Sequence, residues 1–411
     1  MDLIIGAGIT GLSYAAYTNN DYLIIEKERE IGGYCRTIKK NDFVWDYSGH
    51  FFHFQDENIK QDVMKGMDSS QILSVKKNTQ IRFKDKLVDY PFQKNVHQLG
   101  QEDFIDCLYD LFQNPYKDYS TFKEMLYAKF GKSIAEKFLI PYNEKLYACD
   151  LNTLDVDAMG RFFPFANKED IIANFKNQDE NSYNAHFLYP KGGAIEYVHS
   201  VCKNVDSDKI CLNEDVISID VHNKIVYTNK REIKYDNLIS TMPFPSLMKY
   251  ANIDFDSKLY TCNKVLVFNI GFDKKGLDCI NNWIYYPENK YPFYRVGMYD
   301  NIFNSDKLSV YVELGYKEHE IIDERVALEH TLERLKQAGI ISDHNIEAMC
   351  SLVMNPAYVH ITKEMEEDKI QKMNLLNSLN IYSIGRYGSW IYCSIEDNIK
   401  EAKVLSHRLK S

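Results

Sequence analysis

A glycine-rich turn at the start of the chain constrains its fold more than any other stretch. The apolar run of residues 3–5 predicts a buried strand, and Gly6, Gly8 and Gly11 follow it directly. Gly6 permits a tight turn, Gly8 lets the backbone approach a pyrophosphate, and Gly11 lets the next helix pack close to the strand. Residues 12–17 favour a helix, so the N–H groups at its start can face an anion.

A second apolar run, residues 22–25, ends in Glu26, twenty residues after Gly6. An acid at this position is expected to bind the ribose of an adenosine. The glycine pattern alone is a weak signal, but strand, glycines, helix, strand and acid within 26 residues indicate a dinucleotide site. Gly32 and Gly33, followed by Arg36, suit a second close approach to a large cofactor. This extension is typical of FAD-binding chains, and the alternative is an ordinary Gly-Gly loop.

Composition limits the classes of function. The 411 residues are enough for two or three packed regions. With 49 basic and 59 acidic residues the net charge is −10, which argues against non-specific nucleic-acid binding but leaves room for an anionic substrate. Nine scattered cysteines without a CxxC motif predict reduced thiols in a cytoplasmic protein, with no disulfide frame and no metal site. Because the first strand begins at residue 2 and no apolar run reaches about 18 residues, we expect no signal peptide and no membrane helix.

The periodicity of apolar residues indicates interleaved domains rather than consecutive ones. Residues 97–182 space apolar side chains at three and four, as amphipathic helices do, whereas most later segments favour short strands. The predicted fold class is α/β, with an FAD-binding Rossmann-like domain of the glutathione-reductase type. Its segments are expected at 1–80, 183–245 and 375–411, with a helical insertion at 97–182 and an antiparallel-sheet substrate domain at 81–96 and 246–374.

In chain order these stretches resemble UDP-galactopyranose mutase, particularly its eukaryotic-type branch, within the FAD fold shared with amine and protoporphyrinogen oxidases. Beyond the first glycine loop, the similarity is carried by the blocks IGGYCRT, GHFFHF, YPFQKNV, PYNEKLY, GRFFP, NAHFLYPKGG, YYPENKYPFYR, NPAYVHIT and GRYGSWIYCS. The glycine loop, IGGYCRT and GRYGSWIYCS are general to the FAD fold. YPFQ, PYNEKLY and YPENKYPFYR are much more specific.

The resemblance implies an isomerase that interconverts the pyranose and furanose forms of a UDP-sugar for cell-surface polysaccharide biosynthesis. FAD must be reduced although nothing is consumed, because N5 of the reduced flavin acts as the nucleophile at the anomeric carbon. A true oxidoreductase of the amine or protoporphyrinogen oxidase kind shares every cofactor motif and is the alternative. The sequence leaves open whether NAD(P)H reduces the flavin and whether the chain forms an oligomer.

The resemblance also assigns catalytic and cofactor roles. Arg161 and Arg295 match the two arginines that bind the diphosphate, whose charge suits a planar guanidinium. His50 lies in the loop expected beside the isoalloxazine, where a conformational response to the flavin redox state or acid–base chemistry is expected. Gly385 and Arg386 open the last cofactor turn and are expected, with help from Arg36, to hold the FAD pyrophosphate and ring edge.

A further set of polar and aromatic residues matches the substrate contacts of the family. The tyrosines expected to hydrogen-bond the diphosphate are Tyr285, Tyr358 and Tyr392; the uracil contacts are Tyr90 and Gln93; the other nucleotide contacts are Asn143 and Asn184. Tyr147 replaces a family tryptophan in the sugar or uracil pocket, and Ser48 replaces the first glycine of a Gly-Gly-His motif. These departures put the identity of the sugar in doubt more than the reaction type, and an amino- or deoxy-sugar remains open.

Overall fold

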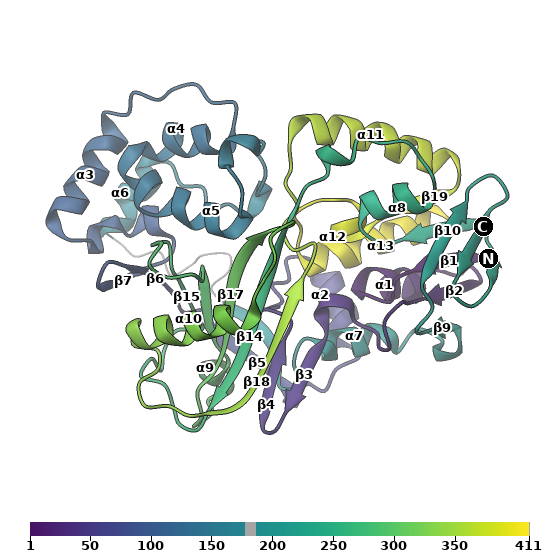
Figure 1. The fold of residues 1–411 in the computed structure, drawn as a ribbon, viewed down its shortest axis with the longest axis horizontal. Helices are drawn as coiled ribbons and strands as arrows, with labels where there is room; N and C mark the ends of the chain where they lie inside the picture. The colour runs from purple at the N-terminus through teal and green to yellow at the C-terminus, as the bar shows by residue number, and fades with distance from the viewer. Residues whose placement is uncertain (177–185, 411) are drawn as a thin grey trace.

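Five short strands form a parallel sheet at one end of the molecule (Figure 1). The computed structural model describes residues 1–176 and 186–410. The strands run in the order β19-β13-β1-β2-β9, so distant parts of the chain meet in one sheet. Their bounds are β1 (Asp2–Ile5), β2 (Tyr22–Ile25), β9 (Ile210–Cys211), β13 (Asn237–Ser240) and β19 (Ile381–Ser383). Leu3 and Ile4 are fully buried, as expected for a parallel strand covered on both faces.

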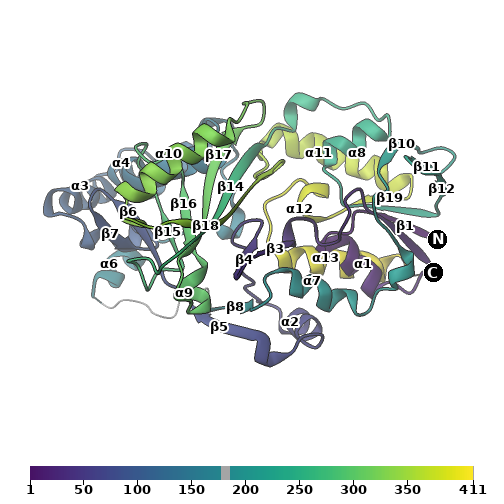
Figure 2. The same cartoon turned by 60° about the horizontal axis from the view of Figure 1, so that its bottom comes forward.

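Helices cover this sheet from both sides, which Figure 2 shows. On one face α1 (Ile9–Tyr17), α7 (Ile195–Cys202) and α13 (Ile395–Arg408) pack their apolar residues against the strands. The other face packs against α8 (Phe244–Tyr250), α11 (Lys363–Ser378) and the antiparallel strands β10 (Val216–Asp220), β11 (Ile225–Thr228) and β12 (Glu232–Lys234). The three-layer arrangement is that of a Rossmann-like domain.

A second, seven-stranded sheet lies beside the first domain, with the order β18-β14-β17-β16-β15-β6-β7. Its neighbouring strands are antiparallel except for β6 and β15, which are parallel. The sequence predicts an antiparallel sheet and does not indicate this parallel pair. The strands are β6 (Thr79–Phe83), β7 (Lys86–Asp89), β14 (Asn263–Phe272), β15 (Trp283–Tyr285), β16 (Arg295–Met298), β17 (Ser309–Lys317) and β18 (Ile346–Met354). Helix α10 (Glu324–Gln337) covers one face. The opposite face, which carries Tyr285 and Tyr311, belongs to the largest core cluster.

The helices that follow β7 in the sequence form a separate lobe, drawn in blue in Figure 1. They are α3 (Gln101–Phe112), α4 (Phe122–Ile134), α5 (Ile140–Tyr147) and α6 (Lys168–Lys176). Residues 133–139, expected to continue as an amphipathic helix, instead pass through a π-helical turn at Ala135–Leu139. The remaining elements are α2 (Glu57–Met64), α9 (Tyr299–Phe303), α12 (Gly385–Gly388) and the paired strands β3 (Thr37–Lys40) with β4 (Phe43–Asp46) and β5 (Ile72–Lys76) with β8 (His186–Pro190).

The observed architecture confirms the predicted fold class: a Rossmann-like domain interleaved with a helical lobe and a sheet-rich domain. Within the described residues, no helix combines the length and apolar character needed to cross a bilayer.

Candidate functional site

The first glycine loop closes tightly between β1 and α1. Gly6 has a φ of +102°, and a Cβ at Gly11 would lie only 2.0 Å from the Gly6 carbonyl oxygen. Glu26, at the end of β2, accepts hydrogen bonds from the N–H groups of Ala7 at 2.7 Å and Glu28 at 2.9 Å. The acid and the glycine turn therefore meet at the carboxyl edge of the sheet, where dinucleotides bind in such folds.

The second glycine pair packs onto the first loop. The Gly32 N–H donates to the Ala7 carbonyl at 2.8 Å, and a Cβ at Gly33 would stand 3.3 Å from the Cα of Gly8. Arg36 turns back on this loop, where its Nε donates to the Gly33 carbonyl at 2.9 Å. Side chains are thus missing where two backbone segments approach each other, and this cradle together with the start of α1 fits a dinucleotide pyrophosphate.

Helix α12 adjoins the same loop and carries Arg386. A Cβ at Gly385 would lie 2.7 Å from the Thr10 Oγ1. Because glycine has no Cβ, α12 can pack close to α1. The Arg386 guanidinium donates to the carbonyls of Cys393 at 3.1 Å and Ala357 at 3.3 Å. The structure therefore brings Gly385 to the glycine cradle and directs Arg386 toward the neighbouring tyrosines.

Arg295 and Glu313 form a cross-strand ion pair on the face of the large sheet that bears the site. The two residues are register partners on β16 and β17. Arg295 Nε and Nη2 donate to the two Glu313 carboxylate oxygens at 2.5 and 2.7 Å, and Ser48 Oγ also donates to this carboxylate. Glu313 is fully buried. Burial acts to lower the pKa of Arg295, but the adjacent carboxylate outweighs it, so the pKa lies above its usual range.

Sequence reasoning missed Glu313, although a signal for it existed. It is the one charged residue in the apolar run 308–314, where a strand buried on both faces would carry none.

His50 lies near both arginines and is held neutral. Its Nδ1 is 3.1 Å from the Ser48 carbonyl oxygen. Burial lowers the pKa of His50 to about 4; the positive charges of Arg386 and Arg295 add to this effect, while the Ser48 carbonyl and Glu313 oppose it. A neutral imidazole at physiological pH can accept or donate a hydrogen bond, but it is not a charged acid in this state.

This environment predicts a pH-dependent loss of stability in acid. Because the pKa of His50 falls from an ordinary 6.5 to about 4 on folding, the unfolded chain binds more protons between these values. Stability contributed by His50 is therefore lost as the pH falls from 6.5 to 4. We expect the wild type to lose about 3 kcal/mol more than a His50→Gln variant over this range. Urea unfolding of both proteins from pH 4 to 7 measures it, and parallel profiles would contradict the assignment.

Tyrosines from five stretches of the chain form two groups near Arg295. Tyr285 is its cross-strand partner on β15, and the Tyr285 ring lies 5.2 Å from Tyr90 and 5.0 Å from Tyr142 between centroids. A second group joins Tyr147 to Tyr358 at 5.9 Å and Tyr358 to Tyr392 at 5.8 Å. The charge of Arg295 acts on the hydroxyls of both Tyr285 and Tyr358, so one member of each group lies within electrostatic range of the guanidinium. We call these six residues, Tyr90, Tyr142, Tyr147, Tyr285, Tyr358 and Tyr392, the tyrosine ring.

The phenols of Tyr285 and Tyr358 are neutral donors. Burial raises the pKa of Tyr285 and Tyr358, while Arg295 partly opposes the shift. Arg386 stands over the ring of Tyr392 at 4.7 Å and over that of Tyr358 at 5.4 Å. The arrangement combines two fixed cations with hydroxyls that can donate without added charge, which suits the oxygens of a diphosphate.

Three of the predicted nucleotide-binding residues keep a buried oxygen without a partner among residues 1–176 and 186–410. These atoms are Gln93 Oε1, Asn143 Oδ1 and the Tyr147 hydroxyl. The amide nitrogens are already used, because Gln93 Nε2 donates to the Pro164 carbonyl and Asn143 Nδ2 to the Leu139 carbonyl. Buried acceptors of this kind cost stability until a donor arrives. Asn184 lies outside the described residues.

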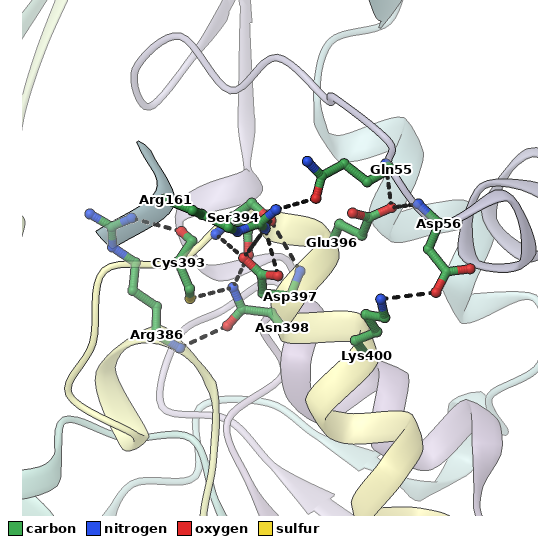
Figure 3. A network of polar contacts seen from close by, with 10 residues as sticks. All are labelled: Gln55, Asp56, Arg161, Arg386, Cys393, Ser394, Glu396, Asp397, Asn398 and Lys400. Atoms are coloured by element: carbon green, nitrogen blue, oxygen red, sulfur yellow. Dashed lines mark hydrogen bonds and ion pairs between the residues drawn. The ribbon is translucent and has the colours of Figure 1, made fainter. Parts of the chain in front are cut away.

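Arg161 takes a different position, at the start of α13 (Figure 3). Its Nη2 lies 2.7 Å from both carboxylate oxygens of Asp397, and Nη1 donates to Gln55 Oε1. The side chain is 42% exposed. The neighbouring Phe162 contacts Tyr392 with ring centroids 5.0 Å apart. The arginine therefore borders the tyrosine ring, but its guanidinium is engaged by the cofactor-side helix.

The network in Figure 3 also ties the loop after His50 to α13. The backbone N–H groups of Gln55 and Asp56 donate to one Glu396 oxygen at 2.9 and 2.8 Å. Lys400 pairs with Asp56 at 3.0 Å. Sequence reasoning found none of these contacts, because their partners lie more than 300 residues apart.

Lys145, within the PYNEKLY block, anchors the YPENKYPFYR segment beneath the site. Its Nζ donates to the carbonyls of Tyr286 at 2.9 Å, Glu288 at 2.6 Å and Tyr291 at 2.7 Å. This ammonium group therefore fixes the loop that leads into Arg295. Two of the three more specific sequence blocks are thus in direct contact through this lysine.

Removing this anchor should destabilise the protein. We expect Lys145→Met to lower the free energy of unfolding by about 3 kcal/mol, because the carbonyls lose a charged donor and stay partly buried. Lys290→Met is the matched control, since Lys290 lies in the same loop with its side chain 40% exposed. Urea denaturation measures both variants. Equal stability of the two would show that the carbonyl contacts contribute nothing.

Comparisons with known proteins agree with this architecture. Residues 4–65 match the family model of the NAD(P)-binding Rossmann-like domain. Coproporphyrinogen III oxidase of Staphylococcus aureus (strain NCTC 8325 / PS 47) is 23% identical over 323 residues, which cover 67% of this chain and 68% of that protein.

Solved structures share the fold over nearly the whole chain. Reduced UDP-galactopyranose mutase superposes with a TM-score of 0.91 at 24% identity, covering 99% of this chain and 93% of that one. Cyclohexylamine oxidase from Brevibacterium oxydans IH-35A superposes with a TM-score of 0.68 at 12% identity, covering 99% of each chain. At these identities the similarity establishes the fold that a mutase and an oxidase have in common.

Proposed function

We propose that this protein is a flavin-dependent sugar-nucleotide mutase, of the eukaryotic UDP-galactopyranose mutase type, that interconverts the pyranose and furanose forms of a UDP-galactose-like sugar. The observation that carries the proposal is the group of tyrosines near the partly buried Arg295. A diphosphate leaving group carries about two negative charges and needs fixed cations and hydroxyl donors. The similarity in fold to reduced UDP-galactopyranose mutase supports the same reading.

The glycine cradle would hold FAD. Glu26 would bind the adenosine ribose and the start of α1 the pyrophosphate, as in other Rossmann-like folds. Arg386 and Arg36 would contribute positive charge beside the cofactor. When bound and reduced, FAD supplies a nucleophilic nitrogen for the anomeric carbon. His50, neutral and hydrogen-bonded to its own loop, would position the backbone near the reacting atoms rather than deliver a proton.

The substrate would lie along the tyrosine ring. Arg295 and the hydroxyls of Tyr285, Tyr358 and Tyr392 would hold the diphosphate, and donors such as hydroxyl groups add no charge that would hinder its release and return. At the uracil end, the ring of Tyr90 would stack on the base. The unpartnered oxygens of Gln93, Asn143 and Tyr147 would accept hydrogen bonds from the nucleotide, and Asn184 is proposed to join them.

Arg161 can take part only if it exchanges partners. Asp397 now receives its guanidinium, so a diphosphate must compete with that carboxylate. Arg161 lies next to the tyrosine ring, because the adjacent Phe162 contacts Tyr392. A rotation of the Arg161 side chain, without a movement of the helical lobe, would be the first step of such an exchange.

The alternative is an FAD-dependent oxidoreductase, which the relatedness to coproporphyrinogen III oxidase and cyclohexylamine oxidase favours. Such an enzyme needs the glycine cradle, but it has no use for a cation ringed by tyrosines. The two readings therefore differ at the large sheet and not at the cofactor domain.

One experiment separates them. The purified flavoprotein is reduced with dithionite under anaerobic conditions and supplied with UDP-galactofuranose, and the products are resolved by chromatography. The mutase predicts UDP-galactopyranose from the reduced protein, none from the oxidised protein, and no net change in flavin oxidation state. Stoichiometric flavin reduction by an amine or a porphyrinogen, without sugar conversion, would favour the oxidoreductase instead.

A further inference from the structure

A partly buried lysine lies in the aromatic wall beside the tyrosine ring. Lys77 stands in the turn between β5 and β6, with its Nζ 5.3 Å from the centroid of the Tyr90 ring and 5.6 Å from that of Trp283. Within residues 1–176 and 186–410 no carboxylate pairs with it, and no acidic group acts on its pKa, which burial alone lowers to about 8. An ammonium group removed from water without a counter-ion is costly.

The position of Lys77 is fixed by its neighbours. The backbone of Asn78 and the buried Asn282 exchange two hydrogen bonds: the Asn78 N–H donates to Asn282 Oδ1, and the Asn282 N–H donates to the Asn78 carbonyl, both at 2.8 Å. Asn282 directly precedes Trp283 on β15. The backbone of the turn that carries Lys77 is therefore held against the site-bearing sheet.

The same strand relates Lys77 to Arg295. Trp283 and Tyr285 lie on one face of β15, two residues and so about 7 Å apart, and Tyr285 is the register partner of Arg295. Phe51, the residue after His50, stacks on Trp283 with centroids 5.2 Å apart. Lys77 thus lies beside Trp283, two residues before the cross-strand partner of Arg295, and its charge acts on His53 in the loop after His50.

A second donor in this wall lacks a well-aligned partner. The indole N–H of Trp283 makes no well-aligned hydrogen bond to any described residue, although Trp283 is only 5% exposed, and the Tyr285 hydroxyl is the side-chain oxygen near it. The His53 ring, which Lys77 also influences, is neutral, because burial first and the Lys77 charge second lower its pKa to about 4. Lys77 therefore lies beside several aromatic and imidazole groups but has no carboxylate partner among the described residues, which is unusual for a partly buried ammonium group.

Resting on the proposed function, we propose that Lys77 binds an anionic oxygen group of the sugar nucleotide, as a cation separate from Arg295, Arg161 and Arg386. Two sources present the same chemistry: the diphosphate itself, or a carboxylate carried by the sugar. In the first case Lys77 adds affinity for any UDP-sugar; in the second it selects an acidic sugar and disfavours an amino-sugar.

Calorimetric titration of the FAD-loaded protein with UDP, UDP-galactose and UDP-galacturonate tests this proposal. Lys77→Met should weaken the affected ligand at least tenfold, Lys77→Arg should stay within about threefold of the wild type, and Lys76→Met, which alters an exposed neighbour on β5, should change nothing. A loss for all three ligands identifies the diphosphate as the anion, and a loss for UDP-galacturonate alone identifies a sugar carboxylate. Should Lys77→Met lose its flavin, Lys77→Gln takes its place.

Two results would overturn the proposal, and they are distinguishable. If wild type and Lys77→Met bind every ligand equally, Lys77 has no role in binding while the mutase proposal stands. If the wild type binds none of the three ligands, the sugar-nucleotide function fails and the Lys77 role falls with it.

Discussion

Methionine at position 295 will lower kcat/KM for the UDP-sugar by about 10³-fold and will also destabilise the fold. The catalytic loss follows because Arg295 is the cation at the centre of the tyrosine ring, and loss of one preorganised donor to a developing charge costs about 10² to 10³ in rate. The stability loss, about 3–5 kcal/mol, follows because Glu313 is fully buried and, among the described residues, keeps only Ser48 as a donor. Chromatographic assay and urea denaturation measure the two effects.

A double variant separates the two roles of Arg295. Adding Glu313→Gln to Arg295→Met removes the stranded charge, so we expect most of the lost stability to return while turnover stays low. Arg295→Lys is a second control: it keeps the charge but not the two parallel hydrogen bonds to Glu313, and should recover only part of the activity. Near wild-type turnover in the double variant would remove Arg295 from the substrate site.

The cofactor domain could be predicted from the sequence because its signals are local. The turn that contains Gly6 and Gly11, and the acid Glu26, occupy fixed offsets in one β-turn-α-β unit, and backbone sterics decide them. The motif blocks likewise located Tyr285 and Tyr358, but only the structure shows that they surround Arg295. The motifs therefore predict which residues belong to the site, whereas the register of the strands determines how these residues are arranged in space.

The remainder depends on pairings that no local pattern encodes. The partner of Arg295 is set by the register of β16 against β17, and that of Arg161 by an approach of segments 236 residues apart. Helix α11 went unpredicted because it buries only Met365, Lys369 and Leu376 among sixteen residues, too few for a clear apolar stripe. Lys77 lies in none of the motif blocks; what distinguishes it is its place against Tyr90 and Trp283 without a carboxylate partner among the described residues.

Alanine at position 11 will abolish flavin binding. Its Cβ would lie 2.0 Å from the Gly6 carbonyl oxygen and 3.2 Å from the Ile4 side chain, so α1 must move away from β1. Gly6 cannot yield, because its φ of +102° and the nearby Thr241 hold the turn. We expect the FAD content of the purified protein to fall more than tenfold and stability to fall by about 3 kcal/mol, as in an overpacked core. Flavin absorbance relative to protein absorbance measures the content.

The control for this substitution is Gly100→Ala. Gly100 begins α3 with a φ of −63°, and a Cβ there would meet no atom within 4 Å, so both flavin content and stability should match the wild type. Circular dichroism of Gly11→Ala distinguishes a folded protein without flavin from an unfolded one. A folded Gly11→Ala protein with full flavin would mean that α1 need not touch the glycine turn, and the cradle described here would then not be the dinucleotide site.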